Sequence, residues 1–322
     1  MGGFPAAYEW LKPRQKPARL YHRPTATSPR RLTAACRKST FPNIVTFHRR
    51  KGLGDFGKRI RLSRILLHAR GTLVVAFDHA MILGPISGTI DPARQIRRLV
   101  EAKADAVLLD LGNIRHFAEA ISSSLAPGLI ARLDWTTAFN ESGAGSPNGF
   151  QTCVVAHPED ALRSGADAVI TFLFVGSGDA GFESNEVRRV GSLARECERV
   201  GMPLIVESLA RGAQVQDPRQ SKWLMLHTRM AAELGADVIK TENAEDIDTM
   251  RKVVSACPVP ILVLGGSRTA SDEGIVDTVR TIMQSGAAGV FFGRNIFQSD
   301  NMPELLLRIH SALADKASVQ GK

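Results

Sequence analysis

Eight short apolar runs recur between residues 73 and 292, and they limit the possible folds more than any other feature of this sequence. Successive runs begin 23 to 39 residues apart, which leaves room for one strand, one helix and two short loops. The runs are continuously apolar rather than alternating, as strands are when both faces of a parallel sheet are buried. They are LVVAF (73–77), AVLL (106–109), LIARL (129–133), AVITF (168–172), LIV (204–206), VI (238–239), ILVL (261–264) and GVFF (289–292).

The segments between these runs have the pattern of amphipathic helices. In SDEGIVDTVRTIMQSG (271–286), Ser271 is suited to cap a helix, and the apolar residues that follow share one helix face. Eight strand–helix units in about 255 residues match the size of a (β/α)8 barrel. A doubly wound open sheet is the alternative, but eight evenly spaced units favour closure. We therefore predict an α/β protein in which residues 57–322 form a (β/α)8 TIM barrel.

Positive charge is concentrated in residues 1–56, which hold 12 of the 41 basic residues and 2 of the 32 acidic ones. This segment lacks strand or helix periodicity, so we predict an irregular, disordered basic extension. Its composition suits a transit peptide, a loose tail or a mistaken start codon, and the sequence leaves these open. The remaining residues are close to neutral, so the net charge of +9 does not predict a nucleic-acid partner.

Several classes of protein do not fit the composition. No stretch of about 18 uncharged apolar residues is present, so we expect no membrane partner. The four cysteines form no CxxC pair, which predicts no metal site and a reducing, cytoplasmic compartment. A GxGxxG pattern is absent, and we expect no cofactor.

Charged residues stand at the predicted carboxyl ends of the strands, where barrels place their active sites. Asp78 and His79 follow the first strand, Glu207 the fifth and Lys240 the sixth. A desolvated lysine beside other cations can lose its proton and attack a ketone, forming a Schiff base that lets a neighbouring carbon–carbon bond break. An ion pair of Lys240 with Asp78 or Glu207, which only closes the mouth, is an equal alternative at this point.

The last two strand ends predict a phosphate site. Gly265, Gly266 and Ser267 follow the seventh strand, and Gly293 and Arg294 follow the eighth. Backbone N–H groups of glycine-rich turns and an arginine suit phosphate oxygens, and barrels commonly bind phosphate at these two loops.

Five stretches carry a family resemblance. They are GKRIRLSRI (57–65), AFDHAMILGPISG (76–88), GADVIKTE (235–242), ILVLGGSRTASDEG (261–274) and GAAGVFFGRNIFQSDN (286–301). Together they resemble the archaeal-type class I fructose-bisphosphate aldolases, the amino-dideoxy-heptulosonate synthases and other DeoC/LacD-like Schiff-base aldolases. The resemblance implies a homo-oligomeric barrel enzyme, such as a decamer, that acts on a phosphorylated sugar without a metal.

Matching these motifs assigns roles to single residues. Lys240 would be the Schiff-base lysine and Asp78 the acid or base on the first strand. The glycines and serine of the last two loops, with Arg294, would hold phosphate. His79 would orient the substrate or serve only as a hydrogen-bonded structural histidine.

The sequence departs from the resemblance at the proton donor, which is a tyrosine in many of these enzymes. The segment 57–322 contains no tyrosine. Glu207, one strand before Lys240, is the best substitute, and a salt bridge with Lys240 or Arg211 is its alternative role.

These observations predict a class I, metal-independent aldolase that cleaves or forms a carbon–carbon bond in a phosphorylated ketose such as fructose 1,6-bisphosphate. A synthase, a transaldolase-type enzyme or a thiolase-like relative acting on another keto-sugar phosphate is the alternative. A non-catalytic barrel that binds phosphosugars is the third possibility.

Overall fold

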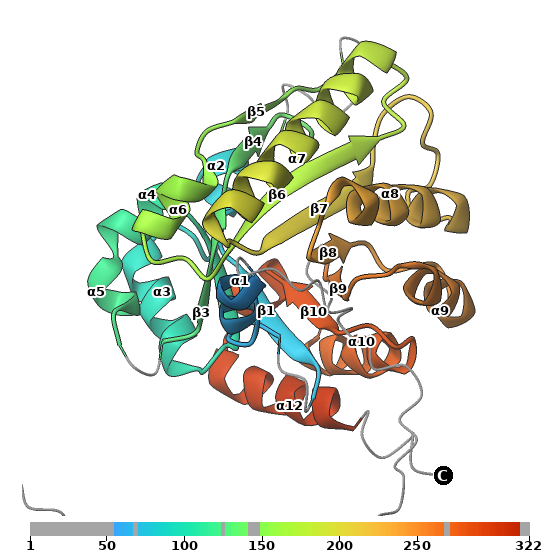
Figure 1. Ribbon diagram of the computed structural model, residues 1–322. Coiled ribbons are helices and arrows are strands. Elements are labelled where there is room, and N and C mark those ends of the chain that lie inside the picture. Colours follow the sequence, from blue (N-terminus) through green and yellow to red (C-terminus); the bar gives the residue numbers. More distant parts are fainter. Residues whose placement is uncertain (1–54, 67–69, 124–125, 141–148, 267–270, 316–322) are drawn as a thin grey trace, which may run out of the picture. The chain divides into compact units, whose positions relative to one another are not determined.

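Eight parallel strands close into a barrel, which confirms the predicted fold (Figure 1). The computed structural model describes residues 55–66, 70–123, 126–140, 149–266 and 271–315. The barrel strands are β1 (Thr72–Ala76), β2 (Ala106–Asp110), β3 (Gly128–Arg132), β6 (Ala168–Val175), β7 (Leu204–Ala210), β8 (Val238–Thr241), β9 (Ile261–Leu264) and β10 (Gly289–Phe292). Because β1 pairs with both β2 and β10, this sheet has no free edge.

Helices surround the barrel, as Figure 1 shows. They are α1 (Asp55–Leu62), α2 (His79–Leu83), α3 (Pro92–Glu101), α4 (Leu111–His116), α5 (Ala118–Ile121), α6 (Pro158–Arg163), α7 (Ala180–Val200), α8 (Ser221–Leu234), α9 (Ile247–Ala256), α10 (Asp272–Gln284), α11 (Arg294–Phe297) and α12 (Met302–Ala314). The predicted cap of α10 is confirmed, since the Ser271 hydroxyl accepts a hydrogen bond from the Gly274 N–H at 3.2 Å. Nothing in the described residues is long and apolar enough, as a helix, to span a bilayer.

Most of the predicted basic extension, residues 1–56, lies outside the described residues. Asp55 and Phe56 are the exceptions, and they form the start of α1. All described residues belong to the unit formed by residues 45–322.

Alternate residues of each strand face the barrel interior and the helices, and both sets are buried. Val74, Ile130 and Ile205 belong to the interior cluster, whereas Val107 and Val169 pack between strands and helices. This double burial is the reason that the strands read as continuous apolar runs in the sequence.

Three aspartates stabilise the amino-terminal end of the barrel, and each directly precedes a strand. Each accepts a backbone N–H bond from the neighbouring strand and an ion pair from a basic residue of the segment 58–70. The pairs are Asp105 with Leu73 N (2.9 Å) and Arg70 (2.6 Å), Asp167 with Leu129 N (3.1 Å) and Arg64 (2.7 Å), and Asp237 with Leu204 N (2.8 Å) and Lys58 (2.9 Å). Helix α1 is thereby tied to the starts of two barrel strands.

A buried histidine joins α8 to the outward face of β7. His227 is fully buried, and its Nδ1 lies 2.7 Å from the Ser208 hydroxyl. Burial, together with the positive charge of Arg211, lowers the pKa of His227 to about 3. The imidazole is therefore neutral in the folded protein across the physiological range.

We predict that Lys58→Met destabilises the barrel far more than Arg64→Met. Of the two partners of Lys58, Glu198 at 2.6 Å has a side chain that is 68% exposed, whereas the Asp237 side chain is 18% exposed. Because Lys58 is itself 4% exposed, its loss leaves the mostly buried Asp237 carboxylate without its cation. That loss is expected to cost about 3 kcal/mol or more in the free energy of unfolding. The Arg64 side chain is 62% exposed, and its loss is expected to cost less than about 1 kcal/mol. Urea unfolding of both variants checks this, and equal losses would contradict it.

We also predict that His227 contributes to acid sensitivity. Its pKa is lower in the folded than in the unfolded chain, so the stability it contributes is complete above about pH 6.5 and falls as the pH drops toward 3. His227→Asn, which cannot gain a charge, should flatten the decline in melting temperature between about pH 6.5 and 5. A decline as steep as that of the unaltered protein would show that the histidine does not control it.

Candidate active site

The charged residues predicted at the strand ends converge at the carboxyl-terminal mouth of the barrel. Asp78 directly follows Phe77 at the end of β1, whereas Glu207 and Lys240 occupy paired positions on the neighbouring strands β7 and β8. All three side chains belong to residues that are no more than 6% exposed. The side-chain alternation that buries Ile205 and Val238 in the barrel interior points Glu207 and Lys240 into the same space two residues later.

Lys240 is held by one carboxylate and one aromatic face. Its Nζ lies 2.7 Å from Glu207 Oε1 and 4.5 Å from the centroid of the Phe291 ring on β10. The ion pair with Glu207 that the sequence analysis gave as an alternative is therefore present. A carboxylate at this distance is also placed to exchange a proton with the amine, so the pair and the Schiff-base role are compatible.

Arg132, at the end of β3, lies among these groups and was not predicted from the sequence. Its side chain is 1% exposed, and its Nη2 lies 2.8 Å from Asp78 Oδ2 and 2.5 Å from Glu207 Oε2. A second contact joins Arg132 Nε to Asp78 Oδ2 at 2.9 Å. One guanidinium therefore bridges the carboxylates of β1 and β7 across the barrel mouth.

The two carboxylates are ionised at neutral pH. Burial raises the pKa of Asp78, but the charge of Arg132, followed by that of His79 when it is protonated and that of Lys240, outweighs burial and brings the pKa below its usual value.

The same balance applies to Glu207. Burial raises the pKa of Glu207, but the charges of Lys240 and Arg132 outweigh burial, so the pKa lies below its usual value. Two ionised carboxylates and two cations thus form a buried group without net charge.

A second buried network supports Arg132 from the side of the helices. Asp134, which is fully buried, accepts hydrogen bonds from Thr171 Oγ1 and Phe172 N, both at 2.7 Å, and from Arg189 Nη1 at 2.6 Å. Its other oxygen lies 3.4 Å from Arg132 Nη1. The Arg132 guanidinium also stacks 4.0 Å from the centroid of the Phe172 ring. Arg132 is consequently fixed on every side by groups that are themselves held.

A two-stranded hairpin lies between β3 and β6, formed by β4 (Asp134–Thr136) and β5 (Thr152–Val154). Its Trp135 Nε1 donates a hydrogen bond to the Met81 carbonyl of α2 at 3.0 Å. This contact joins the segments that follow β1 and β3, the strands that supply Asp78 and Arg132.

The predicted phosphate loops lie together at the ends of β9 and β10. Asn295 Nδ2 donates a hydrogen bond to the Gly265 carbonyl at 3.0 Å, which joins the two loops. Gly266 has a left-handed backbone, with φ of 66°. Arg294 Nε is buried and has no hydrogen-bond partner among the described residues, so it is a donor available to an anion. Ser267 lies outside the described residues.

His79 lies directly against the second of these loops. Its ring packs edge-on against Phe297 with centroids 5.2 Å apart, and a Cβ on Gly293 would lie 2.9 Å from its Nε2. Burial lowers the pKa of His79 more than the neighbouring Asp78 raises it, so the imidazole is neutral at pH 7.

An apolar cluster lies beyond Glu207 on β7. Leu209, two residues beyond Glu207 on β7, is 1% exposed and packs with Phe172, Phe174 and Phe150. Arg211, which the sequence analysis offered as a partner of Glu207, instead pairs with Glu242 at 2.6 Å. The inward carboxylate nearest Lys240 is therefore Glu207.

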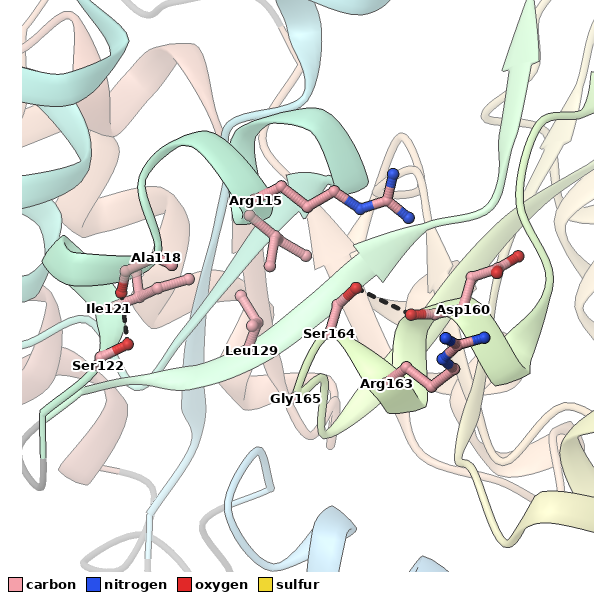
Figure 2. Close-up of a pocket in the computed structure, with 10 residues that line it drawn as sticks. Arg115, Ala118, Ile121, Ser122, Leu129, Asp160, Arg163, Ser164 and Gly165 are labelled. Carbon is pink, nitrogen blue, oxygen red and sulfur yellow. Dashed lines mark hydrogen bonds between the residues drawn. The ribbon is translucent and has the colours of Figure 1, made fainter.

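A surface hollow of about 630 Å³ lies elsewhere, between α4, α5 and α6 (Figure 2). Arg115, Asp160 and Arg163 line it on the outer side of the barrel, together with Leu129 near the start of β3. No residue of the group around Lys240 lines it, so it is separate from the barrel mouth.

A closed (β/α)8 barrel with a buried lysine–carboxylate pair at its carboxyl-terminal mouth has the groups that a Schiff-base barrel enzyme needs. Residues 72–299 match the model of the DeoC/LacD family aldolases. The chain belongs to this family and is an aldolase, an enzyme that makes or breaks carbon–carbon bonds.

Three known proteins show how the similarity is distributed. The chain is 30% identical to the 2-amino-4,5-dihydroxy-6-oxo-7-(phosphonooxy)heptanoate synthase of Streptomyces griseus, over 82% of this chain and 89% of that protein. It is 31% identical to the 3-hydroxy-5-phosphonooxypentane-2,4-dione thiolase of Klebsiella pneumoniae, over 83% and 85%. An archaeal fructose-1,6-bisphosphate aldolase, solved with its catalytic lysine covalently bound to the carbinolamine intermediate, superposes with a TM-score of 0.69 at 25% identity, covering 80% of this chain and 99% of that one.

The contact between Gly293 and His79 gives a stability prediction. Gly293→Ala places a methyl group against the imidazole, and overpacking of this kind costs about 1–3 kcal/mol. His79→Ala removes the ring, so the double variant should recover most of the loss that Gly293→Ala causes. Urea unfolding of the four proteins measures the coupling, and purely additive losses would show that the ring does not set the limit.

Proposed function

We propose that this chain is a class I aldolase that acts on a phosphorylated ketose through a Schiff base on Lys240. The observation that carries the proposal is the buried contact of 2.7 Å between Lys240 Nζ and Glu207 Oε1 at the barrel mouth. This geometry supplies a nucleophile and a proton-transfer partner in one place, as Schiff-base chemistry requires.

The first half of the reaction builds the Schiff base. The Lys240 ammonium gives a proton to Glu207, and the neutral amine attacks the ketone carbon of the substrate. The resulting carbinolamine hydroxyl takes the proton back from Glu207 and leaves as water, so the carbon–nitrogen double bond forms and Glu207 is again ionised. No oxidant, metal or cofactor enters these steps.

The second half breaks the carbon–carbon bond. The ionised Asp78 takes the proton of the hydroxyl group on the carbon beyond the bond to be cleaved. That carbon leaves as an aldehyde while the bonding electrons move into the iminium and produce an enamine. The enamine carbon then takes up a proton, which balances the one that Asp78 gained and leaves Asp78 ionised again. Addition of water to the resulting iminium releases the ketone product and returns Lys240 as an ammonium group. Run in reverse, the same groups join a ketone to an aldehyde.

The substrate class rests on the loops after β9 and β10. The free Arg294 Nε and the backbone of Gly265, Gly266 and Gly293 form a site that suits a phosphate. Ser267 and the neutral His79 complete the proposed set. Fructose 1,6-bisphosphate is the first substrate to test. Because residues 57–322 contain no tyrosine to serve as a donor, other keto-sugar phosphates, of the kind for which the synthase and thiolase relatives are named, are the second.

A cytoplasmic homo-oligomer is part of the same proposal. The free thiols of Cys153, Cys197 and Cys257 support a reducing compartment, and the family resemblance supports assembly of several copies.

Borohydride reduction in the presence of ketose phosphates tests the proposal. We expect one reduced adduct on Lys240, identified by peptide mass spectrometry, and its complete loss in Lys240→Met. The matched control is Lys222→Met, which removes an exposed lysine of α8 and should leave both trapping and turnover unchanged. Trapping that persists in Lys240→Met, or turnover that EDTA abolishes, would contradict the mechanism.

A further inference from the structure

We propose that Arg132 is a positioning residue of the aldolase reaction, which holds Asp78 and Glu207 together as two ionised carboxylates on one guanidinium. The inference rests on the proposed function, because it assigns the two carboxylates their proton-transfer roles. It goes beyond that function by naming the group on which both roles depend.

The geometry of the contacts carries the inference. Nη2 of Arg132 lies within 2.8 Å of an oxygen from each carboxylate, so the two acids share a single nitrogen. Glu207 uses its other oxygen, Oε1, for Lys240. Arg132 therefore holds Oε2 of Glu207 and leaves Oε1 free to exchange a proton with Lys240.

Arg132 is not placed to bind the substrate itself. Its side chain is 1% exposed, and its nitrogens are taken up by Asp78, Glu207 and the more distant Asp134. The Phe172 ring covers the guanidinium at 4.0 Å. An arginine so enclosed acts through the carboxylates that it contacts.

The charges around the two carboxylates show what its removal would do. Asp78 also faces His79 and Lys240, and Glu207 also faces Lys240, while Arg294 acts on His79 from the neighbouring loop. Without Arg132, two buried carboxylates would share one adjacent basic side chain, that of Lys240, which itself gives up a proton in the proposed reaction. Burial and mutual repulsion then favour a proton on one of them near neutral pH.

This protonation would block the reaction in a specific way. A protonated Asp78 cannot accept the hydroxyl proton, and a protonated Glu207 cannot accept the proton of Lys240. Arg132 therefore keeps both carboxylates ionised, and so able to accept protons, at neutral pH.

The test compares four variants with the unaltered protein over a range of pH, by the rate of ketose-phosphate cleavage and by borohydride trapping on Lys240. Arg132→Gln removes the charge and keeps polar donors, and Arg132→Met is a second neutral variant that keeps packing against Phe172. Arg132→Lys restores a charge. Arg70→Gln is the matched control, because it removes an arginine that pairs with Asp105 at the opposite, amino-terminal end of the barrel.

We expect the acid limb of the pH–rate profile to move to higher pH by about 1 to 3 units in the neutral variants, as loss of an adjacent opposite charge does to a carboxyl group. Arg132→Lys should bring the limb back toward its original position. Arg70→Gln should lower the melting temperature and leave the limb in place. A uniform loss of rate at every pH, with no movement of the limb, would overturn the proposal.

A measurement without substrate separates this inference from the proposed function. In protein labelled with carboxyl-¹³C glutamate, the Glu207 signal is assigned by its absence in Glu207→Gln and is titrated by NMR. Its midpoint should rise in Arg132→Gln whether or not any ketose phosphate is cleaved. An unmoved midpoint would overturn the role of Arg132, whereas failure of trapping in the unaltered protein would overturn only the proposed reaction.

Discussion

The mouth of the barrel depends on one constraint, which is that ionised groups removed from water must neutralise one another. The four charged residues meet this constraint together, because the acidic Asp78 and Glu207 pair with the basic Arg132 and Lys240. An isolated buried charge is costly, whereas paired and hydrogen-bonded charges are tolerated. Any proton that moves between Lys240 and Glu207 moves within this group, so the chemistry changes the internal distribution of charge without changing its total.

The opposite end of the barrel uses the same chemistry for another purpose. There the aspartates at the strand starts accept backbone N–H bonds from neighbouring strands and pair with basic residues of the α1 region. Lys58 pairs with Asp237 and Glu198 at this end of the barrel, away from the predicted active site. The two ends of the barrel thus divide stability and reactivity, as is usual for this fold.

The fold could be predicted from the sequence because burial on both faces of every strand leaves a continuous apolar run, and the helices between them keep their own period. Asp78, Glu207 and Lys240 could be predicted because each directly follows or interrupts such a run. Arg132 could not, since LIARL reads as an ordinary apolar strand with one basic residue. Only the closure of the barrel shows that the inward position of this arginine faces two carboxylates from strands distant in the sequence.

The apolar cluster beyond Glu207 and the buried Arg132 belong to a single arrangement. Leu209 belongs to an apolar cluster with Phe172 and Phe174, and the same Phe172 ring stacks on Arg132. A cluster that excludes water strengthens the ion pairs beside it, because charges interact more strongly where the dielectric is low. It also makes an unpaired carboxylate more costly. A site that uses a glutamate beside an apolar wall therefore requires a fixed cation on that glutamate, and in this barrel Arg132 occupies the position that meets the requirement.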